Sequence, residues 1–288
     1  MSNIDSPAVA RRRVRLALRA ARLAKKLTQS QVARAMDWSL SKVIRIEKGE
    51  VNVSPSDLKV LLEHLDVTDP GTVEELLDDV RLSRSERWTV SADDREHMTP
   101  AMRELFQFEA DAIALRYFNN LLIPGPLQTP AYAEAVFASY PQLWDPATVA
   151  ARIAIRERRR QRVLRPGGPQ YFVLLDESVL SRDRGGSSVM RGQIEQLRDM
   201  TAEGRIQLRL IPLAGRLIFQ IGPFALVDLE EGKSALLYRE TADGDEIIHD
   251  LSAVQGHRKR FDQMWSAALD QDNSLARIID RIAELSTR

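Results

Sequence analysis

Two closely spaced helix-start signals constrain this chain more than any other feature of its sequence. Thr28 is followed by Gln31, the capping-box pattern in which two residues satisfy each other's backbone amides. Ser39 has the same N-cap chemistry, and Gly49 is a residue type that often ends a helix. Few residues lie between Thr28 and Ser39, so the first helix must be short and a tight turn must join it to the second. The pattern therefore predicts two short helices, at residues 29–36 and 39–48.

The apolar residues of these helices fall on one side, where the helices can cross and pack. The small Ala33 allows a close approach. The expected buried seam consists of Val32, Met36, Val43 and Ile46. The second helix keeps an exposed face on its other side, which can lie in a DNA major groove about 12 Å wide. This face is expected to contain Leu40, Ser41, Lys42 and Arg45.

Three further helical segments flank this pair. Pro55 and Pro70 each follow a residue suited to an N-cap, so both mark a first helical position. Apolar residues at helical spacing indicate another helix near the N-terminus. The expected segments are 9–26, 55–64 and 70–81. Together, the five short helices predict a compact all-α domain over residues 9–81.

Charge is unevenly distributed along a chain whose formal net charge is zero. Residues 1–60 contain 13 Lys and Arg against 5 Asp and Glu, a surplus of +8, and the remainder has the opposite imbalance. A basic head on an acidic body favours a DNA-binding module attached to a second domain. A chance cluster of solvated charge is the alternative.

The motifs TQxxxA and SxSxVxRIExG, at residues 28–33 and 39–49, follow Leu18-Arg19-x-x-Arg22 in a fixed order. Through these motifs the N-terminal segment resembles the XRE, or lambda-repressor-like, helix-turn-helix family. The resemblance implies that the partner is double-stranded DNA. It also implies that the DNA contacts are made by Thr28, Gln29, Ser39, Leu40, Ser41, Lys42, Arg45 and Lys48.

The same resemblance implies roles for single residues. Gln29 would contact a DNA phosphate, and Arg22 and Glu47 would form a structural ion pair. The residues expected to face base edges are Leu40, Ser41 and Arg45. Asp37 stands where the family usually has glycine in the turn. Aspartate tolerates the left-handed conformation better than most residues, so the turn can still form. A salt bridge from Arg45 to Glu47 or Glu50 remains an alternative to base contact.

The chain changes character after a polar, charged segment at 82–99, which is expected to be a linker. Residues 100–287 combine helical patterns with short apolar runs bounded by glycine, proline and charge. The runs expected to be strands are 171–175, 206–211, 224–229 and 235–238. The predicted fold class is therefore an all-α five-helix XRE-type domain followed by a mixed α/β domain.

A basic helix expected over 147–163 contains Arg156 and the run Arg158-Arg159-Arg160. Its apolar residues, which we expect to be buried, are Ile153, Ile155 and Val163. Its arginines are then expected to face solvent or acidic neighbours. The alternative is a second surface for nucleic acid.

The segments IPGPLQTP at 123–130, LLDE at 174–177 and LIP at 210–212 carry a second resemblance. Through them, residues 100–285 resemble the C-terminal domain of actinobacterial regulators, including WhiJ-like and antitoxin-like proteins. Pro126 replaces a leucine that is usual in that group. The resemblance implies no catalytic chemistry. It suggests binding of a small protein encoded nearby or of a small-molecule effector.

No pattern predicts catalysis, a metal site or a cofactor, and we expect a protein that is not an enzyme. The chain has no cysteine, and its histidines lack metal-ligand spacing. Asp176 and Glu177 are adjacent at a strand end, where neighbouring side chains point to opposite faces. A charge effect at a helix N-terminus is the preferred interpretation of this pair.

We expect a cytoplasmic, nucleoid-associated protein with no membrane partner, because no stretch is apolar enough to span a bilayer or to form a secretory signal. The predicted function is sequence-specific transcriptional regulation, in which the helix starting at Ser39 reads a pseudo-palindromic operator. The second domain would support dimerisation and sense an input. The alternative is an antitoxin-like protein whose second domain binds a small partner protein and whose DNA binding autoregulates its operon.

The expected assembly is a homodimer. Two apolar helices, at 251–269 and 274–285, are candidates for the dimer contact, although they can equally close the core of their own domain. Their apolar residues are Phe261, Met264, Trp265, Leu269, Leu275, Ile278, Ile279 and Ile282.

Overall fold

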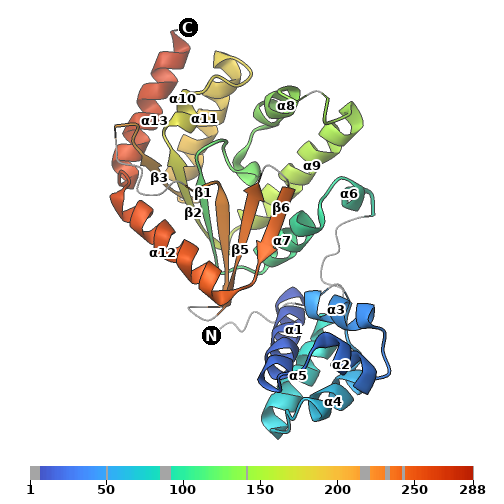
Figure 1. The fold of residues 1–288 in the computed structure, drawn as a ribbon. Coiled ribbons are helices and arrows are strands. Elements are labelled where there is room, and N and C mark those ends of the chain that lie inside the picture. Colours follow the sequence, from blue (N-terminus) through green and yellow to red (C-terminus); the bar gives the residue numbers. More distant parts are fainter. Residues whose placement is uncertain are drawn as a thin grey trace. The chain divides into compact units, whose positions relative to one another are not determined.

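The computed structural model describes residues 7–49, 51–84, 92–140, 142–214, 221–230, 234–241 and 244–287. The chain divides into two compact units, Met1–Thr89 and Val90–Arg288 (Figure 1). Residues 85–91 of the predicted linker 82–99 lie outside the described part of the chain, and Ala92–Glu96 forms the short helix α6.

The described residues of the first unit form five helices. They are α1 (Pro7–Ala24), α2 (Gln29–Ala35), α3 (Leu40–Lys48), α4 (Pro55–His64) and α5 (Pro70–Ser83). Thr28 and Gln31 form the predicted capping box at the start of α2. The side chains of Ser39, Ser54 and Asp69 each accept a hydrogen bond from the backbone amide three residues later. The predicted helix starts are therefore confirmed, because each depends on a contact within one helical turn.

One apolar core joins the helices of the first unit. Val32, Val43 and Ile46 of the predicted seam are at most 4% exposed, and Met36 packs against them from a partly buried position. The longer helices contribute further buried leucines, among them Leu18, Leu58, Leu62 and Leu77. This core fixes the orientation of α3, because the inner face of α3 supplies two residues of the seam.

The second unit is built on one six-stranded mixed sheet (Figure 1). Its strands are β1 (Ala114–Asn119), β2 (Gln170–Asp176), β3 (Gln207–Ile211), β4 (Phe224–Glu230), β5 (Ser234–Thr241) and β6 (Gly244–Ile248). Across the sheet the order is β3-β2-β1-β4-β5-β6. The first three strands are mutually parallel, whereas β4, β5 and β6 are joined by antiparallel pairing. The predicted fold class, an all-α domain followed by a mixed α/β domain, is confirmed.

The sequence did not predict β1 and β6 as strands. β1 is central and largely buried, and its apolar and aromatic run shows no alternation that separates a strand from a buried helix. β6 lies at the sheet edge and pairs Ile247 with Tyr238 and Glu246 with Arg239 of β5. Its sequence is too polar for a strand signal, so the pairing with β5 decides its structure.

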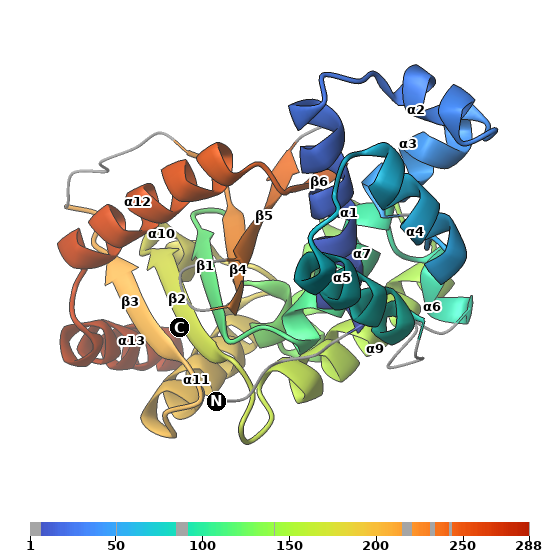
Figure 2. The same cartoon turned by 90° about the horizontal axis from the view of Figure 1, so that it is seen from below.

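Helices cover both faces of the sheet. They are α7 (Pro100–Ala110), the 3-10 turn η1 (Gly125–Leu127), α8 (Pro130–Ala138), α9 (Pro146–Val163), α10 (Ser178–Ser181), α11 (Ser187–Ala202), α12 (Leu251–Ala267) and α13 (Gln271–Ser286). α12 lies on one face, and α9 and α11 lie on the other (Figure 2). α9 and α11 connect consecutive parallel strands, and right-handed crossovers place such helices on the same face.

The arginines of α9 do not share one environment. Ile155 and Val163 are buried, as predicted, whereas Ile153 is only partly buried. Arg158 is 55% exposed and pairs with an aspartate of α6. Arg159 also has an acidic partner, but its side chain is only 10% exposed and pairs with Glu109 in the interior. Acidic neighbours were predicted, whereas the burial of Arg159 was not, because its partner comes from a different helix.

The apolar residues of the last two helices mostly serve their own domain. Phe261 and Met264 of α12 and Ile278 of α13 are buried within the second unit. Trp265 stacks on Phe261 with ring centroids 5.6 Å apart, whereas Ile279 is exposed. The buried residues therefore close the domain core, one of the two roles that the sequence left open.

Asp176 and Glu177, at the end of β2, stabilise local structure. Asp176 Oδ1 accepts from the amide of Ser178 at 3.0 Å, and Glu177 Oε2 accepts from the amide of Leu213 at 2.9 Å. Within the described ranges, neither belongs to a group of three or more side chains that could hold a metal ion.

Candidate nucleic-acid interface

A tight turn with one left-handed residue joins α2 to α3. Asp37 has φ 52°, so aspartate does adopt the conformation that usually favours glycine. The amide of Trp38 donates to the carbonyl of Ala33 at 2.8 Å, which closes the turn. The Ser39 side chain then accepts from a backbone amide of α3 at 3.2 Å. Gly49, with φ 78°, ends the helix.

The predicted ion pair between Arg22 and Glu47 is present. Arg22 Nε donates to Glu47 Oε1 at 2.6 Å, and Nη2 donates to Oε2 at 2.9 Å. The two side chains are 10% and 9% exposed, and Arg22 Nη1 also donates to the carbonyl of Leu27 at 2.7 Å. A bidentate pair of this kind restricts distance and angle together. It therefore anchors α3 to α1.

Gln29 makes a contact within the protein. Its Nε2 donates to Glu47 Oε2 at 2.8 Å, so α2 is tied to the same carboxylate that receives Arg22. This bond positions α2 against α3. The predicted phosphate contact of Gln29 stays a prediction. It requires the side-chain amide of Gln29 either to bind the phosphate while keeping its bond to Glu47 or to break that bond.

The outer face of α3 is accessible. Leu40 is 44% exposed, and the side chains of Ser41 and Arg45 are also exposed. Ser41 and Arg45 are four residues apart and thus neighbours on one helix face. Val43 and Ile46 point inward to the core. α3 therefore separates a packed side from a side that can meet another molecule.

Lys42 lies at the flank of this face and has two neighbours that the sequence reasoning missed. Its Nζ lies 3.7 Å from the ring centroid of Trp38 and 3.2 Å from Asp57 Oδ2. The sequence signal that could have indicated the contact with the ring is Trp38, which stands next to the N-cap residue Ser39. Asp57 lies on α4, so only the tertiary structure brings it to Lys42.

Thr28 and Ser39 have exposed side chains at the starts of α2 and α3. Lys48 is the last residue of α3, and its side chain lies outside the described part of the structure. The structure therefore brings Ser39, Leu40, Ser41 and Arg45 to one end and one face of a single helix.

Each of the two units matches a known protein family. A family described as a domain of unknown function, DUF5753, matches residues 102–280 of the 288 in the chain. The chain belongs to the DUF5753 family. The matched segment begins in α7 and ends in α13, so it contains all six strands of the sheet.

A second family, described as a helix-turn-helix domain, matches residues 14–76 of this DUF5753 protein. The matched residues include the whole of α2, α3 and α4. This match indicates a DNA-binding regulator. No curated protein and no solved structure matches the chain. Among the described residues, no helix has both the length and the apolar character needed to cross a membrane.

Proposed function

We propose that this DUF5753 protein is a sequence-specific transcriptional regulator that reads its operator through α3. The observation that carries the proposal is the accessible face formed by Leu40, Ser41 and Arg45. The ion pair of Glu47 with Arg22 holds the same helix against α1. A rigidly held helix of this width fits the major groove, where residues of a recognition helix contact base edges. The proposed role is binding and not catalysis.

The charge distribution supports DNA as the partner. Residues 1–60 carry 13 basic and 5 acidic side chains. Contacts between basic side chains and phosphates provide sequence-independent affinity and faster association. Base contacts from α3 then add specificity.

The decisive experiment compares specific and random DNA. Operator fragments are recovered by sequencing the DNA bound to the full-length protein in cells. Arg45→Ala should lower operator affinity by about 1–3 kcal/mol and relax the preference at one base position in each half-site. Arg81→Ala is the matched control, because Arg81 is an exposed arginine that pairs with Glu74 and Asp78 of α5. Equal weakening of operator and random DNA by Arg45→Ala would show that Arg45 does not read bases.

We further propose that the protein binds as a homodimer and that the second unit provides the dimer contact and senses an input. One recognition helix places only about 3–4 side chains on base edges, so two heads on half-sites about 34 Å apart are needed for a specific operator. The full-length protein should sediment as a dimer and protect a pseudo-palindrome. Residues 1–85 alone should be monomeric and bind more weakly. A dimeric 1–85 fragment with full operator affinity would contradict this division of roles.

A further inference from the structure

The DUF5753 domain contains a cavity of about 100 Å³ bounded by α7, β1, η1, α9, β4 and β5. About half of its wall is apolar, including Met102, Phe106, Phe118, Ile123, Ile155 and Phe224. All residues that line it belong to the second unit. Apolar cavities of comparable size accept a molecule about as large as one aromatic ring.

Three arginines of α9 also line this cavity, namely Arg152, Arg156 and Arg159. Arg159 is paired with a carboxylate inside the protein. Its Nε and Nη2 each donate to Glu109 at 2.6 Å, and Nη2 donates to the hydroxyl of Tyr117 at 2.7 Å. Its charge is therefore neutralised by the fold itself.

Arg152 and Arg156 are different, because neither forms an ion pair with a carboxylate of the described residues. Arg156 Nε donates to Gln128 Oε1 at 3.1 Å, and its guanidinium lies over the ring of Phe137. The guanidinium carbon Cζ of Arg152 lies 3.8 Å from the ring centroid of Trp144. Its Nε is buried without a hydrogen-bond partner among the described residues.

Burial lowers the pKa of Arg156 to about 10, and the positive charges of Arg159 and Arg152 add to this effect. The side chain still remains charged at neutral pH. Keeping a desolvated charge that no carboxylate pairs with directly is costly, and an anion beside it would reduce that cost.

Gly125 leaves space at the edges of these guanidinium groups. A Cβ at this position would lie 3.6 Å from both Arg156 Nε and Arg159 Nη1. The position therefore tolerates alanine sterically, but its methyl group would occupy space that a ligand could use.

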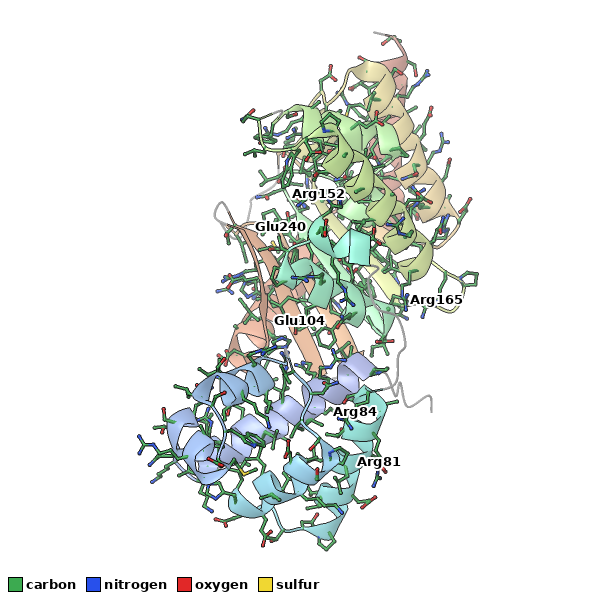
Figure 3. All side chains as sticks on the ribbon, turned by 90° about the vertical axis from the view of Figure 1, so that its right-hand side faces the viewer. Arg81, Arg84, Glu104, Arg152, Arg165 and Glu240 are labelled. Atoms are coloured by element: carbon green, nitrogen blue, oxygen red, sulfur yellow. The ribbon has the colours of Figure 1, made fainter. Side chains whose placement is uncertain are left out.

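The charge balance of the cavity indicates how many negative charges it accepts. Glu240 of β5, labelled in Figure 3, also lines the cavity and is exposed, and its negative charge opposes the lowering of the pKa of Arg156. Its carboxylate accepts from the hydroxyl of Tyr238 at 3.1 Å. Asp245 of β6 accepts from the same hydroxyl at 3.1 Å and also acts on Arg152. Glu240 and Asp245 therefore offset the charges of Arg152 and Arg156 from a distance, without forming an ion pair with either arginine.

We propose that this cavity binds a small organic monoanion, in which Arg152 and Arg156 hold a carboxylate and the apolar wall encloses a body of about one ring. Guanidinium groups match the geometry of a carboxylate, and the nearby carboxylates of Glu240 and Asp245 disfavour a second negative charge on the ligand. This inference deepens the input-sensing part of the proposed function and rests on it only for the regulatory consequence of binding.

The test uses calorimetric titration of the full-length protein with three probes of similar shape. Benzoate is the monoanion, benzamide its neutral counterpart and phenyl phosphate the dianion. Benzoate should bind saturably and at least about 10-fold more tightly than benzamide, since a charge-assisted hydrogen bond is lost in the amide. No binding of benzoate, equal binding of benzamide, or tighter binding of phenyl phosphate would overturn the proposal.

Two variants and one control locate the site. Arg156→Gln should weaken benzoate binding by about 10- to 100-fold. Gly125→Ala should weaken it without loss of thermal stability, which keeps the test valid if Arg156→Gln does not fold. Arg158→Gln should leave binding unchanged, because Arg158 is exposed on the same helix and does not line the cavity. Weakening by Arg158→Gln equal to that by Arg156→Gln would overturn the assignment.

Operator affinity measured with and without benzoate separates this inference from the proposed function. Intact operator binding with no benzoate binding overturns the ligand site alone. Benzoate binding in a protein that binds no operator supports the ligand site and contradicts the proposed DNA function.

Discussion

Each unit of the chain contains a buried bidentate pair between an arginine and a glutamate, and the two pairs have different surroundings. In the first unit, Arg22 and Glu47 join α1 to α3, and Gln29 adds a bond from α2. In the second unit, Arg159 and Glu109 join α9 to α7 beside a cavity. The first pair orients a surface helix, whereas the second places a neutralised charge in the wall of an internal site.

The second pair is also more enclosed. Glu109 is fully buried and receives a further hydrogen bond from the hydroxyl of Tyr117, whose ring stacks on Tyr171. Burial raises the pKa of Tyr117 well above its ordinary range, so the hydroxyl stays protonated and donates. The same type of ion pair therefore forms part of a larger buried network in one unit and a simpler link between helices in the other.

The largest effect is expected from Glu109→Gln. The substitution leaves the guanidinium of Arg159 buried without a counter-charge. It should lower the free energy of unfolding of the second unit by about 3–5 kcal/mol. Urea unfolding measures the loss, and hydrogen exchange of peptides from α7 and α9 assigns it to the second unit. Glu157→Gln is the control, because the partly exposed pair of Glu157 with Arg160 should contribute less than about 1 kcal/mol.

A smaller loss is expected from Glu47→Gln. This change removes the charge received by Arg22 but leaves an amide oxygen that can still accept one hydrogen bond. The first unit should lose about 2–3 kcal/mol, measured by the same exchange method on peptides from α1 and α3. Asp57→Asn provides the comparison, since its pair with Lys42 is partly exposed. If Glu47→Gln costs no more than Asp57→Asn, the pair does not anchor α3.

The glycines after α3 and α11 provide a third comparison. Gly49 and Gly204 both have left-handed φ, of 78° and 70°. Alanine at either position should cost about 1–2 kcal/mol. Gly49→Ala should cost more, because a Cβ there would lie 2.9 Å from Arg15 Nη1, whereas nothing lies within 4 Å at Gly204. Thermal unfolding of the two variants measures the difference, and a larger loss for Gly204→Ala would contradict it.

The smallest effect is expected from the N-caps. Ser39→Ala removes the acceptor for a backbone amide of α3 and should cost about 1 kcal/mol. Thr129→Ala removes the equivalent cap of α8 in the second unit and should cost a similar amount. Unfolding midpoints in urea compare the two. Only Ser39→Ala should also weaken operator binding, because only α3 is assigned to the operator, so an equal effect of Thr129→Ala would contradict that assignment.

Much of the first unit was predictable because its signals are local. Thr28, Ser39 and Gly49 define the ends of α2 and α3 through contacts within one turn. Helical periodicity then identifies which residues are buried, and the family resemblance correctly indicated the Arg22–Glu47 pair. The contact of Lys42 with Asp57 was missed, because it joins two helices whose packing is not written into either helix.

The second unit was predictable only in part. Apolar runs identified four strands, but β1 has no distinguishing alternation and β6 depends on its neighbour. The environment of Arg159 could not be predicted, because Glu109 is 50 residues away in sequence. The cavity itself arises from segments that become neighbours only through the sheet order.

The sequence by itself determined where α2, α3, α4 and α5 begin, which face of α3 is buried and that a mixed α/β domain follows. These features depend on dihedral preference, capping and periodicity, which act over a few residues. The tertiary structure alone decided that Arg159 is neutralised, that Arg152 and Arg156 form no ion pair among the described residues, and that a partly apolar cavity lies beside them. Burial and electrostatic pairing depend on which distant segments meet, and only the folded chain establishes those contacts.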